Sequence, residues 1–269
     1  MSATLPVVSI CCLTYNHEKF LRTAVESFLM QETTFPIEII IHDDASTDRT
    51  PKIVATYQAQ HPDVFVSIRQ PANLFVQGVR GVTVRFLLPH ARGKYVALCE
   101  GDDYWTDPHK LQQQVDFLEA NPEFSGSFHE TQQLMFDGTP GRVFGEKAPS
   151  VMVAEDTFTT LSPFHTSALV FRRTPIAFPA WLADTVSGDM ALFSILTSLG
   201  PLKKLPGIMS VYRKHPAGVT SMPVVTDDYH EKRIELMRRL NEFHGRRYDA
   251  KAQQVIQAHE RAIAHAKPR

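Results

Sequence analysis

Residues 37–51, IEIIIHDDASTDRTP, join an apolar run to a polar loop and then to the signals that start a helix. The run Ile37–His42 is short and rich in isoleucine, which predicts a buried strand. Thr50 and Pro51 suit the N-cap and the first turn of a helix. The segment therefore predicts a strand, an acidic loop and a helix in that order.

The same order occurs on both sides of this segment. Val7–Leu13 predicts a strand and His17–Met30 predicts a helix with an apolar stripe. Val64–Arg69 and the run that ends at Cys99 predict two more strands, with a helix near Val79–Leu88 between them. Strands that alternate with helices predict an α/β fold with a mainly parallel, doubly wound sheet, whose ligand site lies at the carboxyl ends of the strands.

The second half of the chain has a different pattern. Ser125–Phe136 and Ser167–Phe171 predict strands on either side of a loop-like segment, and an apolar helix is expected to begin at Gly188-Asp189. Two charged helical stretches follow, over roughly Asp227–His244 and Ala250–Ala266. Because nothing in the composition marks a linker, we expect one domain.

Composition excludes several classes of protein. A chain of 269 residues that is 43% hydrophobic and 21% charged can bury one substantial core. A formal net charge of −1 gives no overall field for binding nucleic acid.

Cys11, Cys12 and Cys99 lack metal-ligand spacing and are expected to be buried, reduced thiols. With neither a leader pattern nor a long apolar run, we expect a cytoplasmic protein without a membrane span.

Acidic residues follow the strand that ends at Cys99, in the sequence LCEGDDYW (98–105). Asp107, just before Pro108, is sufficient to cap the next helix, so Glu100, Asp102 and Asp103 need another explanation. Clustered carboxylates repel one another unless a cation or donor groups hold them. A divalent cation with oxygen ligands, Mg²⁺ or Mn²⁺, would let these acids bind a diphosphate.

The loops at this edge also suit a nucleoside. DDASTD (43–48) offers carboxylates and hydroxyls for a base N–H and ribose hydroxyls, and Tyr15 offers a ring for stacking. The pattern predicts a nucleoside diphosphate bound with a divalent cation. Trp105 is expected to pack in the core, and His129 and His165 are more simply explained as structural residues.

Several segments, in this order, resemble the family 2 glycosyltransferases, whose fold is of the GT-A type with a Rossmann-like sheet flanked by helices. The closest pieces are VSICCLTYNHEKFLRTAVESFLMQ (8–31), EIIIHDDASTDRT (38–50) and ARGKYVALCEGDDYWTDPHKLQQQVDFLEANP (91–122). Looser matches are HTSALVFRR (165–173), SGDMALF (187–193) and YRKH (212–215). Such pieces in the right order are a specific signal, although each alone is weak.

The resemblance implies roles for individual residues. The donor-binding residues would be Thr14, Tyr15, Glu18, Asp43, Asp44, Glu100 and Asp102, and the metal would lie at Asp102, Asp103 and His215. Asp189 would be the catalytic base. Two positions depart from the family pattern, because Glu100 stands where relatives often have Asp and Gly188 stands where they usually have Glu. Turn formation by Asp43 and Asp44, helix capping by Asp189 and a plain loop role for His215 remain alternatives.

The implied activity is inverting transfer of a sugar from a nucleoside diphosphate, with a UDP-sugar expected, to a glycan or lipid-linked acceptor in polysaccharide biosynthesis. The cofactor would be Mn²⁺ or Mg²⁺. Residues 1–225 would form the catalytic domain, with a nucleotide-sugar half (1–124) and an acceptor-side half (125–225). Residues 226–269 would form a helical extension, whose basic apolar stripe suits either packing on the catalytic domain or peripheral contact with a membrane. Arg80 or Arg85 would meet phosphate.

Two other classes of protein are less consistent with these residues. A sugar-phosphate nucleotidyltransferase should have a glycine-rich phosphate loop after the first strand, whereas LTYNHEKFL contains no glycine. A non-catalytic nucleotide-sugar-binding module should lack Asp189 or the acids at 100–103, and all of these are present.

Overall fold

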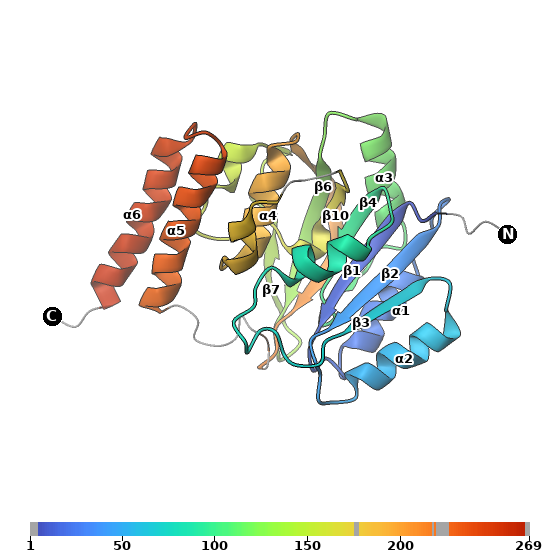
Figure 1. The fold of residues 1–269 in the computed structure, drawn as a ribbon. Coiled ribbons are helices and arrows are strands. Elements are labelled where there is room, and N and C mark those ends of the chain that lie inside the picture. Colours follow the sequence, from blue (N-terminus) through green and yellow to red (C-terminus); the bar gives the residue numbers. More distant parts are fainter. Residues whose placement is uncertain (1–4, 175–177, 217, 219–225, 267–269) are drawn as a thin grey trace.

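The computed structural model describes residues 5–174, 178–216, 218 and 226–266. The chain forms one curled sheet with the strand order β3-β2-β1-β4-β9-β6-β10-β5, while β7 pairs with β6 and β8 pairs with β10. The predicted α/β fold is confirmed, and the sheet runs through the middle of the molecule (Figure 1). The ends of the predicted domain ranges, 1–4, 219–225 and 267–269, lie outside the described residues.

The first half has the expected parallel strands. β1 pairs in parallel with β2 and β4, and β2 pairs in parallel with β3. These strands are β1 (Val8–Thr14), β2 (Ile37–Asp43), β3 (Phe65–Arg69) and β4 (Tyr95–Leu98). Each of them except β3 is almost wholly buried, which explains their continuous apolar sequences. All four therefore end at the same edge of the sheet.

The helices of this half begin later than predicted or are shorter. They are α1 (Leu21–Leu29), α2 (Thr50–Gln60) and α3 (Lys110–Ala120). Residues 17–20 form a turn instead of the first turn of α1, and the N–H groups of Phe20 and Leu21 donate to the His17 carbonyl. At the start of α2, Asp48 accepts from the Thr50 N–H at 2.8 Å. The prediction of Thr50 as N-cap was therefore wrong, because Thr50 is the first helical residue, Arg49 is the N-cap, and Asp48 satisfies the Thr50 N–H.

The predicted helix at Val79–Leu88 is replaced by two short helical turns. They are a π-helical turn, η1 (Thr83–Leu87), and a 3₁₀ turn, η2 (Leu88–His90). Pro89 lacks an N–H and so suits a short turn better than the interior of a longer helix. The remaining 3₁₀ turns are η3 (Ala154–Thr157), η4 (Thr166–Ala168) and η5 (Ala180–Asp184).

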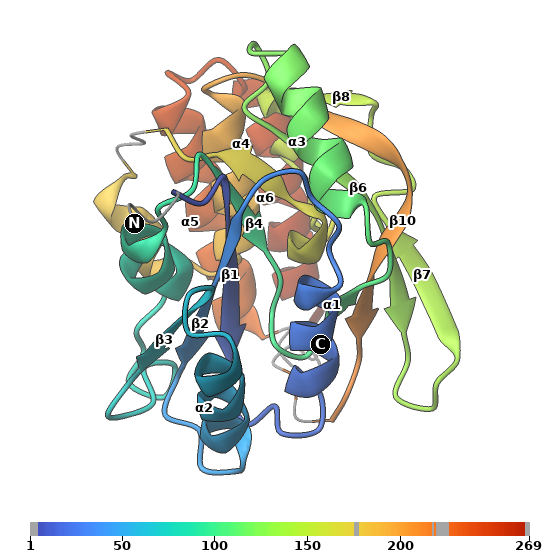
Figure 2. The same cartoon turned by 90° about the vertical axis from the view of Figure 1, so that its right-hand side faces the viewer.

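The second half makes the sheet mixed. Its strands are β5 (Tyr104–Trp105), β6 (Gly126–Leu134), β7 (Pro140–Phe144), β8 (Val151–Met152), β9 (Val170–Arg172) and β10 (Leu202–Arg213). β9 runs antiparallel to both β4 and β6, whereas β10 runs parallel to β6. The segment expected to be a loop contains β7, since Gly138 turns the chain at a φ of 83° and Pro140 is tolerated on an edge strand. Figure 2 shows the β6–β7 hairpin beside β10.

Helices cover both faces of the sheet. α1, α2 and α3 pack on one face through a core that includes Phe28 and Leu111. α4 (Gly188–Thr197) packs on the other face through Leu192 and Phe193. The opposite side of α4 contacts α5 (Asp227–Phe243) and α6 (Asp249–Ala266), which lie side by side in Figure 1. Because α4 is covered on two sides, it is apolar nearly all round.

The apolar stripe on α6 packs against other parts of the molecule. Ala252, Val255 and Ile256 are buried in the same apolar cluster as Leu236 and Leu240 of α5. Packing of the helical extension on the rest of the chain therefore accounts for the stripe, and membrane contact stays a prediction. Within the described residues, no helix combines the length and the apolar character needed to cross a membrane.

Candidate active site

Three loops meet at the carboxyl edge of β1, β2 and β4. The β1–α1 and β2–α2 loops are joined by hydrogen bonds from the Asn16 N–H to the Ser46 hydroxyl at 2.9 Å and from the Thr47 N–H to the Asn16 side chain at 2.8 Å. The loop after β4 joins them through the Gly101 N–H, which donates to the Leu13 carbonyl at 2.9 Å. The meeting of these loops predicted from the sequence is confirmed.

The residues of the first loop that are predicted to surround the nucleoside differ in their exposure and in their hydrogen-bond partners. Tyr15 is 40% exposed, and its ring is available for stacking, while the buried Thr14 hydroxyl has no hydrogen-bond partner among the described residues. Glu18 accepts from the Arg49 N–H at 3.0 Å. Glu18 therefore ties the first loop to the second in addition to any contact with a ligand.

Asp43 and Asp44 are buried and hold loops in place. Asp43 accepts from the Ser46 N–H at 3.2 Å and from the Ser46 hydroxyl. Asp44 accepts from the N–H groups of Leu74 and Phe75, at 2.8 and 3.2 Å. Turn formation, one of the alternatives drawn from the sequence, is thus part of what Asp43 does, while Asp44 holds the loop after β3.

Asp102 lies between two histidines. Its Oδ2 is 3.0 Å from Nε2 of His215 and 3.6 Å from Nε2 of His17. Burial acts to raise the pKa of Asp102, but the His215 hydrogen bond and the charges of both histidines outweigh it and lower that pKa. Burial lowers the pKa of His17, although the Asp102 carboxylate acts to raise it. The carboxylate is therefore ionised and faces two imidazole nitrogens.

Asp103 points to a different set of partners. It accepts from the Arg213 N–H at 2.9 Å, and its Oδ2 is 3.7 Å from Nε2 of His165. Burial and then the charges of Asp102 and Glu100 raise the pKa of Asp103. The sequence placed Asp102, Asp103 and His215 at one cation, whereas the structure groups Asp102 and His215 with His17, and Asp103 with Glu100 and His165.

Glu100 lies at the centre of the site. Both of its oxygens accept from the Thr166 hydroxyl, at 3.0 and 2.9 Å. Burial raises its pKa to about 7, and the charges of Asp102 and Asp189 act in the same direction. Glu100 is therefore near both the histidine-flanked carboxylate and Asp189, and it lines the same cavity as Asp189.

Asp189 lines a cavity of about 220 Å³ next to Glu100. It is the second residue of α4, whose N-cap is Ser187 with a φ of 53°, so helix capping does not explain Asp189. The N-terminus of a helix stabilises a negative charge at this position. The remaining walls are mostly apolar and include Cys11, Leu13, Leu87, Leu98, Leu182 and Leu192.

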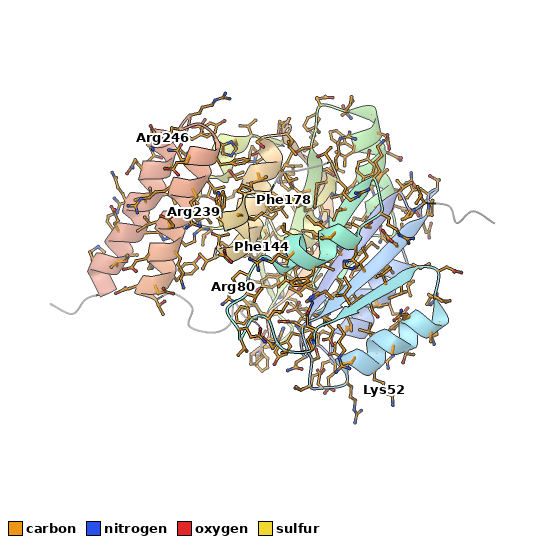
Figure 3. The ribbon with its side chains drawn as sticks, viewed as in Figure 1. Lys52, Arg80, Phe144, Phe178, Arg239 and Arg246 are labelled. Carbon is orange, nitrogen blue, oxygen red and sulfur yellow. The ribbon has the colours of Figure 1, made fainter. Side chains whose placement is uncertain are left out.

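The structure distinguishes the two candidate phosphate-binding arginines. Arg80 lines the cavity from the loop between β3 and η1 (Figure 3), and its guanidinium lies 4.2 Å over the Phe75 ring. Arg85 instead forms an ion pair with Asp184 at 3.1 Å. Of the two, Arg80 is therefore the one positioned at the site.

Three residues near the site were not assigned from the sequence. His17 and His165 face the two aspartates, and the Arg213 guanidinium donates to the Asp102 carbonyl and to the Phe20 carbonyl. His17 and Arg213 occur in the quoted segments TYNHE and YRKH, so proximity in sequence to predicted site residues was the available signal. Trp105 is buried against Phe28, which confirms its expected place in the core.

The family model described as "Glycosyl transferase family 2" matches residues 9–193, from β1 into α4. The chain belongs to this family. The match includes the three loops and Asp189, and it ends before His215.

Several curated proteins resemble the chain over most of its length or over less than half of it. An uncharacterised protein of Mycobacterium tuberculosis is 37% identical over 214 residues, which cover 79% of this chain and 60% of that protein. The chain thus spans about 60% of the length of these curated relatives. The Escherichia coli enzyme UDP-Glc:alpha-D-GlcNAc-diphosphoundecaprenol beta-1,3-glucosyltransferase WfaP is 34% identical over 120 residues, or 45% of this chain and 44% of that enzyme.

Solved structures support the GT-A fold of the glycosyltransferase. S. aureus TarS in complex with UDP-GlcNAc has a TM-score of 0.68 at 20% identity, covering 93% of this chain and 70% of that one. The mannosyltransferase PcManGT of Pyrobaculum calidifontis, in complex with GDP-Man and Mn²⁺, has a TM-score of 0.61 at 18% identity, covering 99% and 77%. At these identities the likeness concerns the fold.

Proposed function

We propose that this family 2 glycosyltransferase is an inverting, metal-dependent enzyme that transfers a sugar from a nucleoside diphosphate to an acceptor hydroxyl. The observation that carries the proposal is the position of Glu100. It lines the same cavity as Asp189, and the charge of Asp102, which contacts His215, also acts on it. A candidate base and a candidate cation-binding group are thus both near Glu100.

The side chains around Asp102 fit a divalent cation. A carboxylate oxygen and an imidazole nitrogen that lie 3.0 Å apart, as in Asp102 and His215, are separated by the distance expected of neighbouring ligands of one ion. When bound, such a cation would neutralise charge on the departing diphosphate. Asp102 and His215 would hold it, and the Arg213 guanidinium fixes the Asp102 backbone by donating to its carbonyl.

Asp189 is the proposed general base. Its carboxylate takes the proton of the acceptor hydroxyl as the hydroxyl oxygen attacks the anomeric carbon and the bond to the diphosphate breaks. Attack on the side opposite the leaving group inverts the configuration at that carbon. A positioned base typically contributes ~10²–10⁴-fold to the rate. The cavity that Asp189 lines is the proposed place for the donor sugar, and Arg80 is among its lining residues.

The donor and the acceptor are proposed by class. A UDP-sugar is supported by the name of WfaP and by the UDP-GlcNAc complex of TarS, while PcManGT is described with GDP-Man. WfaP is named for a diphosphoundecaprenol acceptor, which supports a glycan or lipid-linked acceptor for this enzyme as well. We therefore expect a role in polysaccharide biosynthesis, at the cytoplasmic face of a membrane.

A donor screen tests the proposal without knowledge of the acceptor. The full chain would be incubated with MnCl₂ and a panel of UDP-, GDP- and dTDP-sugars, and release of the nucleoside diphosphate would be measured. We expect slow hydrolysis of one donor or a few related donors, lost on chelation of the metal. Asp189→Asn should bind the same donor without hydrolysing it. Failure to bind or hydrolyse every donor in the panel would contradict the proposed function.

A further inference from the structure

His17 is the residue at the site that neither the family resemblance nor the proposed function assigns. It lies on the turn between β1 and α1, 85 residues before Asp102 in the chain. Its Nε2 faces the same carboxylate oxygen of Asp102 that His215 faces, at 3.6 Å compared with 3.0 Å. Three side chains from three separate loops therefore converge on one point.

The relative orientation of the two imidazoles suits ligation by both. Their ring centroids are 6.0 Å apart and their planes are nearly perpendicular, at 89°. One ligand atom from each of His17, Asp102 and His215 lies within 4.8 Å of the other two. The distances to Asp102 are close to the ~3.0–3.4 Å that separates neighbouring ligands around an ion with bonds of about 2.1 Å. The three atoms are thus close to the arrangement that one ion requires.

The His17 ring is held in this place by packing. Its side chain is 14% exposed, and its edge lies against the Phe20 ring with 6.3 Å between centroids. A Cβ at Gly101 would lie 3.1 Å from Nδ1 of His17, so the absence of a side chain at this position leaves room for the ring. Among the described residues Nδ1 has no hydrogen-bond partner. The directed polar contact of this ring is therefore through Nε2, toward Asp102.

The second group of possible ligands has protein partners instead. The Thr166 hydroxyl donates to both oxygens of Glu100, and the Arg213 N–H donates to Asp103. His165 is engaged through Nδ1 with the Ser167 hydroxyl at 2.9 Å and stacks on the Tyr212 ring. These contacts explain that group as a structural cluster, which leaves the His17 group as the stronger cation site.

We propose that His17 is a third protein ligand of the cation, which makes the site one of two imidazoles and one carboxylate. Imidazole ligands suit first-row transition metals, whereas Mg²⁺ prefers oxygen ligands and keeps most of its water. The site is therefore selective for Mn²⁺ and similar ions over Mg²⁺, and His17 contributes to that selectivity. This inference rests on the proposed function only for the role of the cation in catalysis.

Metal binding, rather than sugar transfer, tests this role. The full chain would be titrated with MnCl₂ or MgCl₂, alone and with UDP, while the electron paramagnetic resonance signal of free Mn²⁺ and the heat of binding are recorded. Removing a group that only supports a metal ligand typically costs 10–100-fold in affinity. Loss of a direct ligand should cost at least as much, so His17→Phe should weaken Mn²⁺ binding at least ~10-fold. Its Mg²⁺ affinity should change by less than about threefold, because Mg²⁺ gains little from imidazole.

The matched variant is His165→Phe, which removes the histidine of the other group and should leave Mn²⁺ affinity within about threefold of wild type. Electron spin-echo modulation of bound Mn²⁺ should show two coordinated imidazole nitrogens in the wild type and one in His17→Phe. Equal affinity and unchanged nitrogen coupling in His17→Phe would overturn the proposal, as would a wild type that binds no Mn²⁺. Mn²⁺ bound through two imidazoles in a chain that hydrolyses no donor would contradict the transferase function and leave the role of His17 standing.

Discussion

Nε2 of His215 lies 3.0 Å from Oδ2 of Asp102, although 113 residues separate the two in the sequence. The contact brings the end of β10 to the loop after β4 and places an imidazole on the carboxylate expected to hold a cation. If that cation supplies several kcal/mol of transition-state stabilisation, Asp102→Asn should lower sugar transfer at least ~10²-fold. Activity would be measured with saturating donor and MnCl₂, beside the wild type in excess chelator.

The fold of Asp102→Asn should survive, because Asn has nearly the same shape and can still contact His215. Circular dichroism and the thermal midpoint would check this. Full activity in the variant, or in chelated wild type, would contradict a metal-dependent mechanism.

Asp44 and Asp189 should give defects of different kinds. Asp44 accepts from the N–H groups of Leu74 and Phe75. Asp44→Ala therefore removes a candidate contact to the nucleobase of the donor, and it also removes the support of that loop. We expect it to weaken donor binding by at least tenfold. Asp189→Asn should keep donor affinity within about threefold and lose ~10²–10⁴-fold in turnover. Calorimetric titration with the donor separates the two, and a large loss of donor affinity in Asp189→Asn would mean that this residue binds and does not act as base.

The central parallel strands were predictable because their side chains are buried on both faces, as the apolar runs in β1 and β2 indicate. β10 was not predicted, since Lys203, Lys204 and an irregular register before Ile208 hide its apolar pattern. Its partner β6 lies far away in the sequence, so only tertiary pairing reveals the strand. Local sequence therefore predicts the elements whose burial is uniform.

The acids of the site were predictable as a cluster, but the side chain that each one contacts was not. Asp102 and Asp103 are neighbours in a turn, which the Asp103 N–H closes by donating to the Glu100 carbonyl at 3.1 Å. Asp102 meets His215 and His17 there, while Asp103 meets His165. His17 comes from another loop, and its approach to Asp102 depends on how β1 and β4 pair. Such contacts follow from the sheet register, which no local pattern contains.

Lys110 offers a prediction for the pH dependence of stability. It is fully buried on α3, with its ammonium 4.2 Å over the Trp105 ring and 2.7 Å from the Gln114 side chain. Burial lowers its pKa to about 7, whereas the pKa in the unfolded chain is about 10.4. Between these values the unfolded chain binds more protons, so Lys110 makes the wild type more stable as pH rises through this window.

Lys110→Met removes that contribution and keeps an unbranched apolar side chain. The stability of the variant relative to the wild type should therefore be greatest near pH 6.5 and decrease by an amount on the order of a few kcal/mol toward pH 10. Urea unfolding at several pH values measures it. The control is Lys52→Met on α2, where the lysine is exposed (Figure 3) and its replacement should change stability little. If the difference in stability between Lys110→Met and the wild type is the same at every pH, Lys110 is equally protonated in the folded and unfolded chains.

Gly101 and Gly188 form a matched pair of glycines near the two ends of the site. A Cβ at Gly101 would lie 2.8 Å from the Thr14 hydroxyl oxygen and 3.1 Å from Nδ1 of His17, whereas a Cβ at Gly188 would have nothing within 4 Å. Gly101→Ala must therefore displace the His17 ring or the Thr14 side chain. Since a misplaced ligand weakens a metal site, we expect about a tenfold loss of Mn²⁺ affinity in Gly101→Ala and none in Gly188→Ala. Titration of both variants with MnCl₂ compares them directly, and equal affinities would mean that neither the packing around Gly101 nor the position of His17 matters for the cation.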